Sequence, residues 1–175
     1  MLIFTQFLFL EQNTMKVRIN NSDREFLKRA IDVAAEGILK GGGPFGAVIA
    51  MNGKVVAEAY NEVVCSSDPT AHAEILAIRK TCSSIGSHDL AGYDLYASCE
   101  PCPMCLGAVY WSGISRVFYA SGRNDAAKAG FGDELFYEEL SKAPGKRKIS
   151  FCRIEDIDGS EVFKLWDRYE NKISY

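Results

Sequence analysis

The sequence predicts an α/β fold with a five-stranded mixed sheet and helices on both faces, and three observations support it. A β-hairpin comes early, because two apolar runs flank the dipeptide Asn52-Gly53, the strongest two-residue hairpin signal. Helical and strand-like segments then alternate, which is typical of parallel strands joined by crossover helices. The chain has 175 residues, 47% of them hydrophobic, which is enough for one domain with its own core.

A helix is predicted over residues 22–39, ahead of the hairpin. Ser22 and Glu25 match a capping box, and apolar residues follow them at helical spacing. The hairpin strands are predicted over residues 45–51 and 54–60, because each is a short, mostly apolar run that ends at the turn. The hairpin therefore supplies an antiparallel pair at the start of the sheet.

The second helix is predicted over residues 70–84, with Asp68 or Thr70 as its cap. Pro103 fits the first turn of a third helix, since proline lacks the N–H group that has no helical partner there. The remaining predicted elements are strands over 93–97, 116–120 and 149–154, and helices over 103–111, over 125–140 with a break at 130–132, and over 160–171.

Charge and cysteine usage narrow the class of protein. The net charge is −3, from 20 basic and 23 acidic residues, whereas proteins that bind phosphate backbones usually carry an excess of lysine and arginine. Nucleic acid is therefore an improbable partner. The six cysteines are too sparse for a disulfide scaffold. Three of them fall within residues 99–105, which suggests a metal in a reducing compartment, and we expect a cytoplasmic protein with no membrane partner.

The first ten residues, MLIFTQFLFL, are apolar but too short to span a bilayer. They lack the positive charge that opens a secretory signal, and no cleavage site of small residues follows. Two interpretations are open: a segment that packs on the domain, or an extension upstream of a start at Met15. The second is favoured, so that residues 1–14 are an N-terminal extension and residues 15–175 form the domain.

The strongest functional signal is His72-Ala-Glu74, followed by Cys102-Pro-Met-Cys105 at the start of the next predicted helix. One imidazole and two thiolates at two helix N-termini can hold a divalent ion, because the helix ends and the ion both favour deprotonated sulfur. Three protein ligands leave the fourth tetrahedral position to water, as in catalytic zinc sites. We therefore expect one Zn²⁺ per chain, held by His72, Cys102 and Cys105.

Glu74 is expected to be the acid–base group of this site. It stands two residues from the histidine ligand, so it can lie beside the water without binding the metal. Two other interpretations of the cysteines are open, an iron–sulfur cluster and a structural zinc that also uses Cys99. The iron–sulfur interpretation lacks a fourth cysteine at the usual spacing, because Cys152 is far away.

These motifs resemble the cytidine-deaminase-like superfamily, whose zinc signature is H-x-E…P-C-x-x-C, and within it the small bacterial-type guanine deaminases. The resemblance covers residues 22–175 and implies a three-layer α/β/α fold. The matching stretches are Gly42-Gly-Pro-Phe-Gly-Ala-Val48, Asp68-Pro-Thr-Ala-His-Ala-Glu-Ile75, Ser98-Cys-Glu-Pro-Cys-Pro-Met-Cys-Leu-Gly-Ala108, Asp125-Ala-Ala-Lys-Ala-Gly-Phe131 and Asn171-Lys-Ile-Ser-Tyr175.

The resemblance implies a small-molecule purine substrate, with guanine and water giving xanthine and ammonia. Water activated at the zinc would add to C2 of the ring while Glu74 protonates ring N3. Asn61 would hydrogen-bond the purine edge. Phe45 and the backbone at Ala47 would line the base pocket, and the amide near Ala73 would contact the substrate or the bound water.

The C-terminal segments carry the narrower part of the resemblance. Asp133 matches a carboxylate that assists proton delivery to the leaving amine, although Gly132 precedes it where a second polar residue is expected. Tyr175 matches a tyrosine whose tail closes the site. In the guanine deaminases that tail is exchanged between subunits, which implies a homodimer in which residues 155–175 are swapped.

Three rival functions remain open at this stage. A tRNA adenosine deaminase shares the zinc motif, but the acidic balance and the lid-like C-terminus disfavour it. A deaminase of guanosine or another amino-heterocycle is a closer variant, because the same pocket could admit a ribose or a modified ring. A zinc-bearing binding module without turnover would have no need of Glu74 as a proton carrier.

Overall fold

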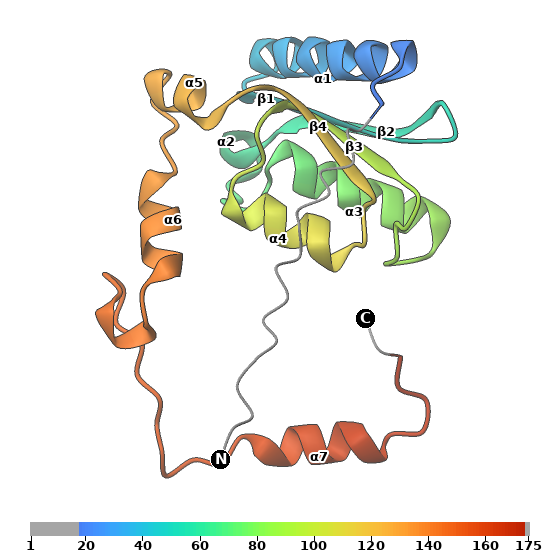
Figure 1. Ribbon diagram of the computed structural model, residues 1–175. Coiled ribbons are helices and arrows are strands. Elements are labelled where there is room, and N and C mark those ends of the chain that lie inside the picture. The colour runs from blue at the N-terminus through green and yellow to red at the C-terminus, as the bar shows by residue number, and fades with distance from the viewer. Residues whose placement is uncertain (1–17, 174–175) are drawn as a thin grey trace, which may run out of the picture.

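The computed structural model of the protein describes residues 18–173 and is built on a four-stranded sheet in the order β2-β1-β3-β4 (Figure 1). Strands β1 (Gly43–Met51) and β2 (Lys54–Asn61) form the predicted antiparallel hairpin. Strand β3 (Asp94–Cys99) pairs antiparallel with β1, and β4 (Arg116–Ser121) pairs parallel with β3. The sheet is therefore mixed, as predicted.

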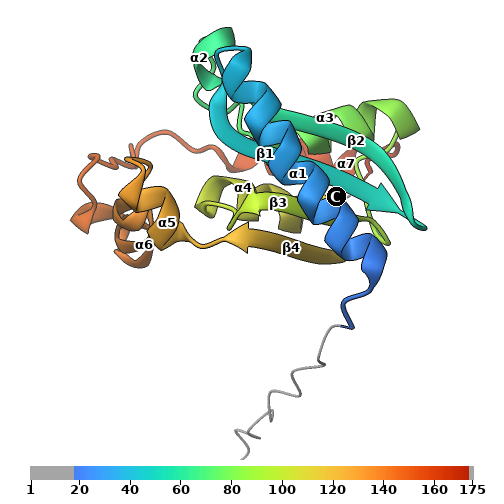
Figure 2. The ribbon, with the colours of Figure 1, turned by 90° about the horizontal axis from the view of Figure 1, so that it is seen from above.

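Helices cover both faces of this sheet. Helix α1 (Asn21–Leu39) crosses one face, and α3 (Ala73–Ile85) and α4 (Pro103–Trp111) lie on the other (Figures 1 and 2). This three-layer α/β/α arrangement is the one predicted. The crossover from β3 through α4 to β4 joins two parallel neighbours, the connection that a helix of this length makes.

The core consists of two apolar clusters, one on each side of the sheet. Successive residues of a strand point to opposite faces, so Val48 packs toward α1 whereas Ile49 packs toward α3 and α4. The α1 side is completed by Tyr96, whose ring stacks on Phe118 with centroids 4.9 Å apart. The α3 and α4 side is larger and includes Leu95 and Val109. Helices α3 and α4, whose N-termini carry the candidate site, are thereby fixed on the sheet.

The capping box of α1 lies two residues earlier than predicted. Asn20, not Ser22, is the N-cap, and its side chain accepts a hydrogen bond from the Asp23 N–H at 2.9 Å. The Asp23 carboxylate in turn accepts from the Asn20 N–H at 2.8 Å. Asp23 takes this place instead of Glu25 because it is buried beside Tyr96, whose hydroxyl donates to it at 2.6 Å.

The predicted fifth strand over residues 149–154 is wrong within the part of the chain that the structure describes. These residues have an irregular backbone, and Ile149, Phe151 and Ile154 are all exposed. These residues pair with none of the four strands of the sheet, so their backbone has no ladder of hydrogen bonds to make it a strand. A short helix that was not predicted, α2 (Val63–Ser66), follows β2.

The C-terminal third extends away from the three layers. It contains α5 (Arg123–Lys128), α6 (Glu134–Ser141), a short 3₁₀ turn, η1 (Pro144–Lys146), and α7 (Ser160–Arg168) (Figure 1). The break predicted inside the first helical stretch is confirmed between α5 and α6. Helix α7 ends at Arg168, three residues before the predicted end. Its apolar residues are exposed: Val162, Phe163, Leu165 and Trp166.

Candidate metal centre and active site

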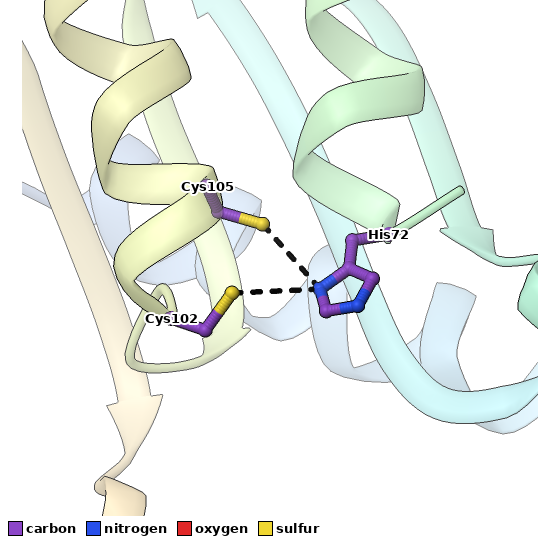
Figure 3. A group of neighbouring side chains, drawn as sticks. All are labelled: His72, Cys102 and Cys105. Atoms are coloured by element: carbon purple, nitrogen blue, oxygen red, sulfur yellow. Dashed lines mark hydrogen bonds between the residues drawn. The ribbon is translucent and has the colours of Figure 1, made fainter. Parts of the chain in front are cut away.

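Two helix N-termini bring the predicted metal ligands together. His72 is the N-cap of α3, and Cys102 is the N-cap of α4, with Cys105 in the first turn of the same helix (Figure 3). The predicted cap of α3 by Asp68 or Thr70 is wrong. Asp68 instead accepts hydrogen bonds from the N–H and hydroxyl of Thr70, which close the turn before the helix.

The three ligand atoms have the separations that a tetrahedral zinc ion requires. Nδ1 of His72 lies 3.6 Å from Sγ of Cys102 and 3.5 Å from Sγ of Cys105. Zn–N and Zn–S bonds of ordinary length, at tetrahedral angles, place a nitrogen and a sulfur ligand about 3.6 Å apart. All three atoms lie within 4.8 Å of one another. The residues therefore fit a zinc ion with three protein ligands.

Cys99 does not join this group. Its thiol donates to the carbonyl of Gly122 at 3.7 Å, and among the described residues the only cluster of His, Cys, Asp and Glu side chains with metal-ligand spacing is His72, Cys102 and Cys105. The Cys₃His zinc and iron–sulfur interpretations therefore have no support in the geometry. Cys152 is exposed and distant in the chain.

The surroundings of Cys102 favour its thiolate form, which is the form that binds a metal ion. A hydrogen bond from Cys105, and then the contact with His72, lower the pKa of Cys102 to about 4 against the effect of burial. Hydrogen bonding to Cys102 and burial raise the pKa of the Cys105 thiol. A divalent ion favours the deprotonated form of a thiol that coordinates it.

Glu74 lies in the first turn of α3, one residue beyond the helix start, and is only 8% exposed. Burial raises the pKa of its carboxyl above the ordinary value. Its side chain lines the same cavity as His72 and Cys102, as predicted from the spacing of the motif. A carboxyl group that is buried beside the ligands without being one of them can carry a proton at the reacting centre.

A cavity of about 490 Å³ opens in front of the metal ligands. Four of the predicted site residues line it together with the ligands His72 and Cys102, and its apolar walls are suited to a flat ring. Cys105 is the exception among the ligands, because it is fully buried beneath the cavity. The predicted residues in the lining are Phe45, Asn61, Glu74 and Asp133.

Phe45 reaches the cavity because β1 bulges at this point. Pro44 and Phe45 stand between two register positions of the hairpin, where Gly43 pairs with Asn61 and Gly46 pairs with Tyr60. The Gly46 N–H is satisfied by the hydroxyl of Ser98 on β3 at 3.0 Å. The Phe45 ring then meets the edge of Phe131 at 5.0 Å between centroids.

Asn61 ends β2 and is only 7% exposed. Its Oδ1 accepts a hydrogen bond from the Val63 N–H at 3.2 Å, which holds the amide at the wall of the cavity. Asp133, the N-cap of α6, also lines the cavity. Burial raises the pKa of the Asp133 carboxyl, and the nearby Cys102 adds to the rise.

Ala47 and Ala73 are placed differently from these side chains. Both are fully buried members of the core cluster behind the cavity, and neither contributes to its described lining. The backbone contacts with a ligand that were expected of Ala47 and Ala73 therefore stay a prediction. Tyr175 and residues 1–14 lie outside the described residues.

The structure also adds residues that the sequence did not single out. Arg123 and Glu100 line the cavity near Asp133, and the Arg123 guanidinium lies 4.9 Å from the centre of the Tyr137 ring. A second, largely apolar cavity of about 550 Å³ adjoins the site on its α6 side and shares His72, Cys102 and Phe136 with the first. No sequence signal marks it, since its walls come from exposed residues of separate segments.

Comparison with known proteins agrees with this geometry. Residues 20–121 match the family described as the cytidine and deoxycytidylate deaminase zinc-binding region. Guanine deaminase from Bacillus subtilis is 49% identical over 151 residues, which cover 86% of this chain and 97% of that protein. The crystal structure of that guanine deaminase superposes with a TM-score of 0.86 and covers 90% of this chain and 99% of that one.

A more distant relative covers a smaller share of the chain. The tRNA-specific adenosine deaminase from Bacillus subtilis is 39% identical over 99 residues, which cover 57% of this chain and 62% of that protein.

None of the helices between residues 18 and 173 is both long and apolar enough to cross a membrane.

Proposed function

Because this chain belongs to the zinc-binding cytidine and deoxycytidylate deaminase family, we propose that it deaminates guanine to xanthine and ammonia by hydrolysis. One observation carries the proposal: the match to guanine deaminase from Bacillus subtilis spans nearly the whole of that protein, beyond the zinc motif that all family members share. The matched region includes the α5 and α6 segment, whose Phe131 and Asp133 line the cavity in front of the ligands.

The reaction forms a C–O bond at C2 of guanine and breaks the C2–N bond to the amino group, with ammonia as the leaving group. Zinc, bound at one ion per chain, would lower the pKa of a coordinated water to about 7 and so make a nucleophile available at neutral pH. Glu74 would take a proton from the attacking water and deliver it to ring N3. Its buried position suits this transfer because it excludes competing solvent.

Two further side chains complete the proposed chemistry. Asp133 lines the same cavity as Glu74 and carries the proton that the departing amino group needs. Its raised pKa brings its protonated form closer to neutral pH, as general acids require. Asn61 binds the edge of the purine, and Phe45 supports its ring. The N-terminal amides of α3, Ala73 among them, have no partner inside the helix and can donate hydrogen bonds to an anionic group.

We also propose a homodimer in which the C-terminal segment of one subunit covers the site of the other. Helix α7 supports this, because it stands apart from the sheet layers in Figure 1 while Phe163 is 70% exposed and Leu165 is 67% exposed. A monomer rarely leaves such an apolar face open to water. The second cavity is an apolar surface next to the metal ligands that a helix of this kind can cover. Tyr175 would then close the site of the partner.

Light scattering at micromolar concentration tests the dimer. We expect a particle of twice the chain mass, and Phe163→Glu should shift it toward the monomer. A wild-type monomer of 19.3 kDa would contradict the dimer.

We also propose a cytoplasmic location. The thiolate ligands must stay reduced to bind a metal, and the cytoplasm is a reducing compartment in which free thiols persist.

Ammonia release from a panel of substrates tests the activity. The purified protein, with its zinc content measured, is given guanine, guanosine, cytidine and an adenosine in an RNA hairpin. We expect turnover of guanine at least about a hundredfold above the others, since a site built around specific hydrogen bonds rejects poorly matched ligands by large factors. Preference for the RNA adenosine would favour the tRNA-specific alternative. The match to a tRNA-specific adenosine deaminase, which covers 62% of that protein, makes that alternative worth including.

A further inference from the structure

The amide of Asn61 is held so that only one of its polar atoms can face a ligand. The Val63 N–H lies 3.2 Å from Oδ1 of Asn61. A backbone N–H can only donate, so the atom that faces it must be the carbonyl oxygen, and the amino group Nδ2 must point elsewhere. This assignment follows from the chemistry of the donor and not from the labels of the two atoms.

The amino group is directed toward the cavity. Within residues 18–173, Nδ2 of Asn61 has no hydrogen-bond partner. Every fully buried side-chain nitrogen or oxygen in the same residues does have a partner, so Nδ2 is not fully buried. Nδ2 is therefore accessible, and Asn61 is part of the cavity wall. The site consequently offers the Nδ2 amino group at this point, and because this group only donates, a ligand can satisfy it only with acceptor atoms.

Gly43 holds the amide from the opposite strand. It pairs with Asn61 across the hairpin, and a Cβ on Gly43 would lie 2.9 Å from Oδ1 and 3.1 Å from Cγ of Asn61. The φ angle of Gly43 is outside the left-handed region, so the backbone itself does not require glycine. The close approach of the Asn61 amide is what a larger residue would disturb.

We propose that Gly43 is a positioning residue which, together with the Val63 N–H, fixes Asn61 with its amino group toward the substrate and so selects purines with an acceptor edge. The inference rests on the proposed function. Guanine presents O6 and N7 on the edge away from C2, and both are acceptors, whereas a 6-amino purine presents a donor in place of O6. A donor that faces the Asn61 amino group leaves both groups unpaired, which is costly in a buried site.

The first test replaces Gly43 by alanine and compares Gly145→Ala, whose added Cβ meets no atom within 4 Å. Gly43→Ala should raise the KM for guanine about tenfold or more and change kcat much less, while zinc content stays that of wild type. Gly145→Ala should leave all three values unchanged. A KM for Gly43→Ala within about twofold of wild type would overturn the positioning role.

The second test uses Asn61→Asp, which keeps the shape and the acceptor for the Val63 N–H but presents an acceptor to the ligand. Binding of guanine and 2,6-diaminopurine is measured by calorimetry on zinc-loaded Glu74→Gln protein, with and without Asn61→Asp. The preference for guanine over the diamine should fall about tenfold or more in the double variant. An equal change in both affinities would overturn the inference.

These readouts separate the inference from the proposed function. Absence of guanine turnover by wild type would contradict the function, whereas the affinity ratio of the two purines reports the orientation of Asn61 without any turnover. Should Gly43→Ala fail to fold, the Asn61→Asp comparison still decides the orientation of the amide.

Discussion

Nδ1 of His72 lies 3.5 Å from Sγ of Cys105, although the two residues belong to different helices and are separated by 33 positions in the chain. This distance matches the separation of two ligands on one tetrahedral zinc ion. It arises because α3 and α4 pack on the same face of one sheet, with their N-termini at the same end (Figures 1 and 3). The scaffold thus sets the ligand geometry before an ion binds.

Replacing Cys102 by serine should remove the metal. The hydroxyl oxygen is a much poorer zinc ligand than a thiolate, so we expect zinc per chain to fall from about one to near zero and activity to fall with it. Elemental analysis of the purified protein measures this. Cys65→Ser is the matched control, because Cys65 is exposed and its thiol donates to the carbonyl of Lys40, away from the metal ligands. Equal zinc content in both variants would contradict the assigned ligand set.

Glu74→Gln should retain zinc and lose turnover. Glutamine has nearly the same shape but cannot accept and return a proton, and general acid–base groups contribute about a hundredfold to ten thousandfold to rate. We expect kcat to fall within that range while the affinity for guanine is kept. Glu62→Gln, in the turn after β2, is the control. Full activity of Glu74→Gln would remove the proposed mechanism.

Deleting residues 173–175 should lower kcat sharply and leave zinc content intact. The deletion removes Tyr175, the proposed lid residue, without touching either ligand helix. Steady-state kinetics and metal analysis on the same preparation measure both quantities. Tyr175→Phe separates the ring from its hydroxyl. An unchanged kcat in the truncated protein would exclude the lid.

The network at Asp23 predicts how stability depends on pH. Burial opposes ionisation of Asp23, but hydrogen bonds from the Asn20 N–H and the Tyr96 hydroxyl, and then the charge of Arg116, lower its pKa below the ordinary 3.8. A group whose pKa is lower in the folded state stabilises the fold above its unfolded pKa. That stability is lost as the pH falls through the folded pKa.

Asp23→Asn should therefore destabilise the protein by roughly 2 kcal/mol at neutral pH, with the difference from wild type shrinking below about pH 4. Denaturant unfolding at several pH values measures it. Asp32→Asn, at an exposed position of the same helix, serves as control. A difference between Asp23→Asn and wild type that stays constant down to pH 2 would contradict the assigned role.

Local sequence signals predicted most of the fold because the elements that form the layers carry them strongly. Asn52-Gly53 fixed the hairpin, and both Asn52 and Gly53 have the positive φ angles that such a turn requires. The strand predicted over 149–154 was wrong for a different reason. A short run that contains apolar residues can face a partner surface as well as a sheet, and the local sequence does not distinguish the two.

The candidate site was predictable where chemistry and spacing coincide. His72, Glu74, Cys102 and Cys105 lie together because a motif at a helix start fixes both residue type and position. The roles of Gly43 and Ser98 were not predictable, because they depend on contacts across strands: Gly43 leaves space for the Asn61 amide, and Ser98 satisfies the Gly46 N–H at the bulge. Such contacts require the register of the sheet.

The most direct test of the account is the reaction of zinc-loaded protein with guanine in water enriched in ¹⁸O. Mass spectrometry of the product should show xanthine with one ¹⁸O atom, at C2, together with one ammonia per guanine consumed, and Glu74→Gln should form neither at a comparable rate. Zinc at one ion per chain with no conversion of guanine would contradict the account.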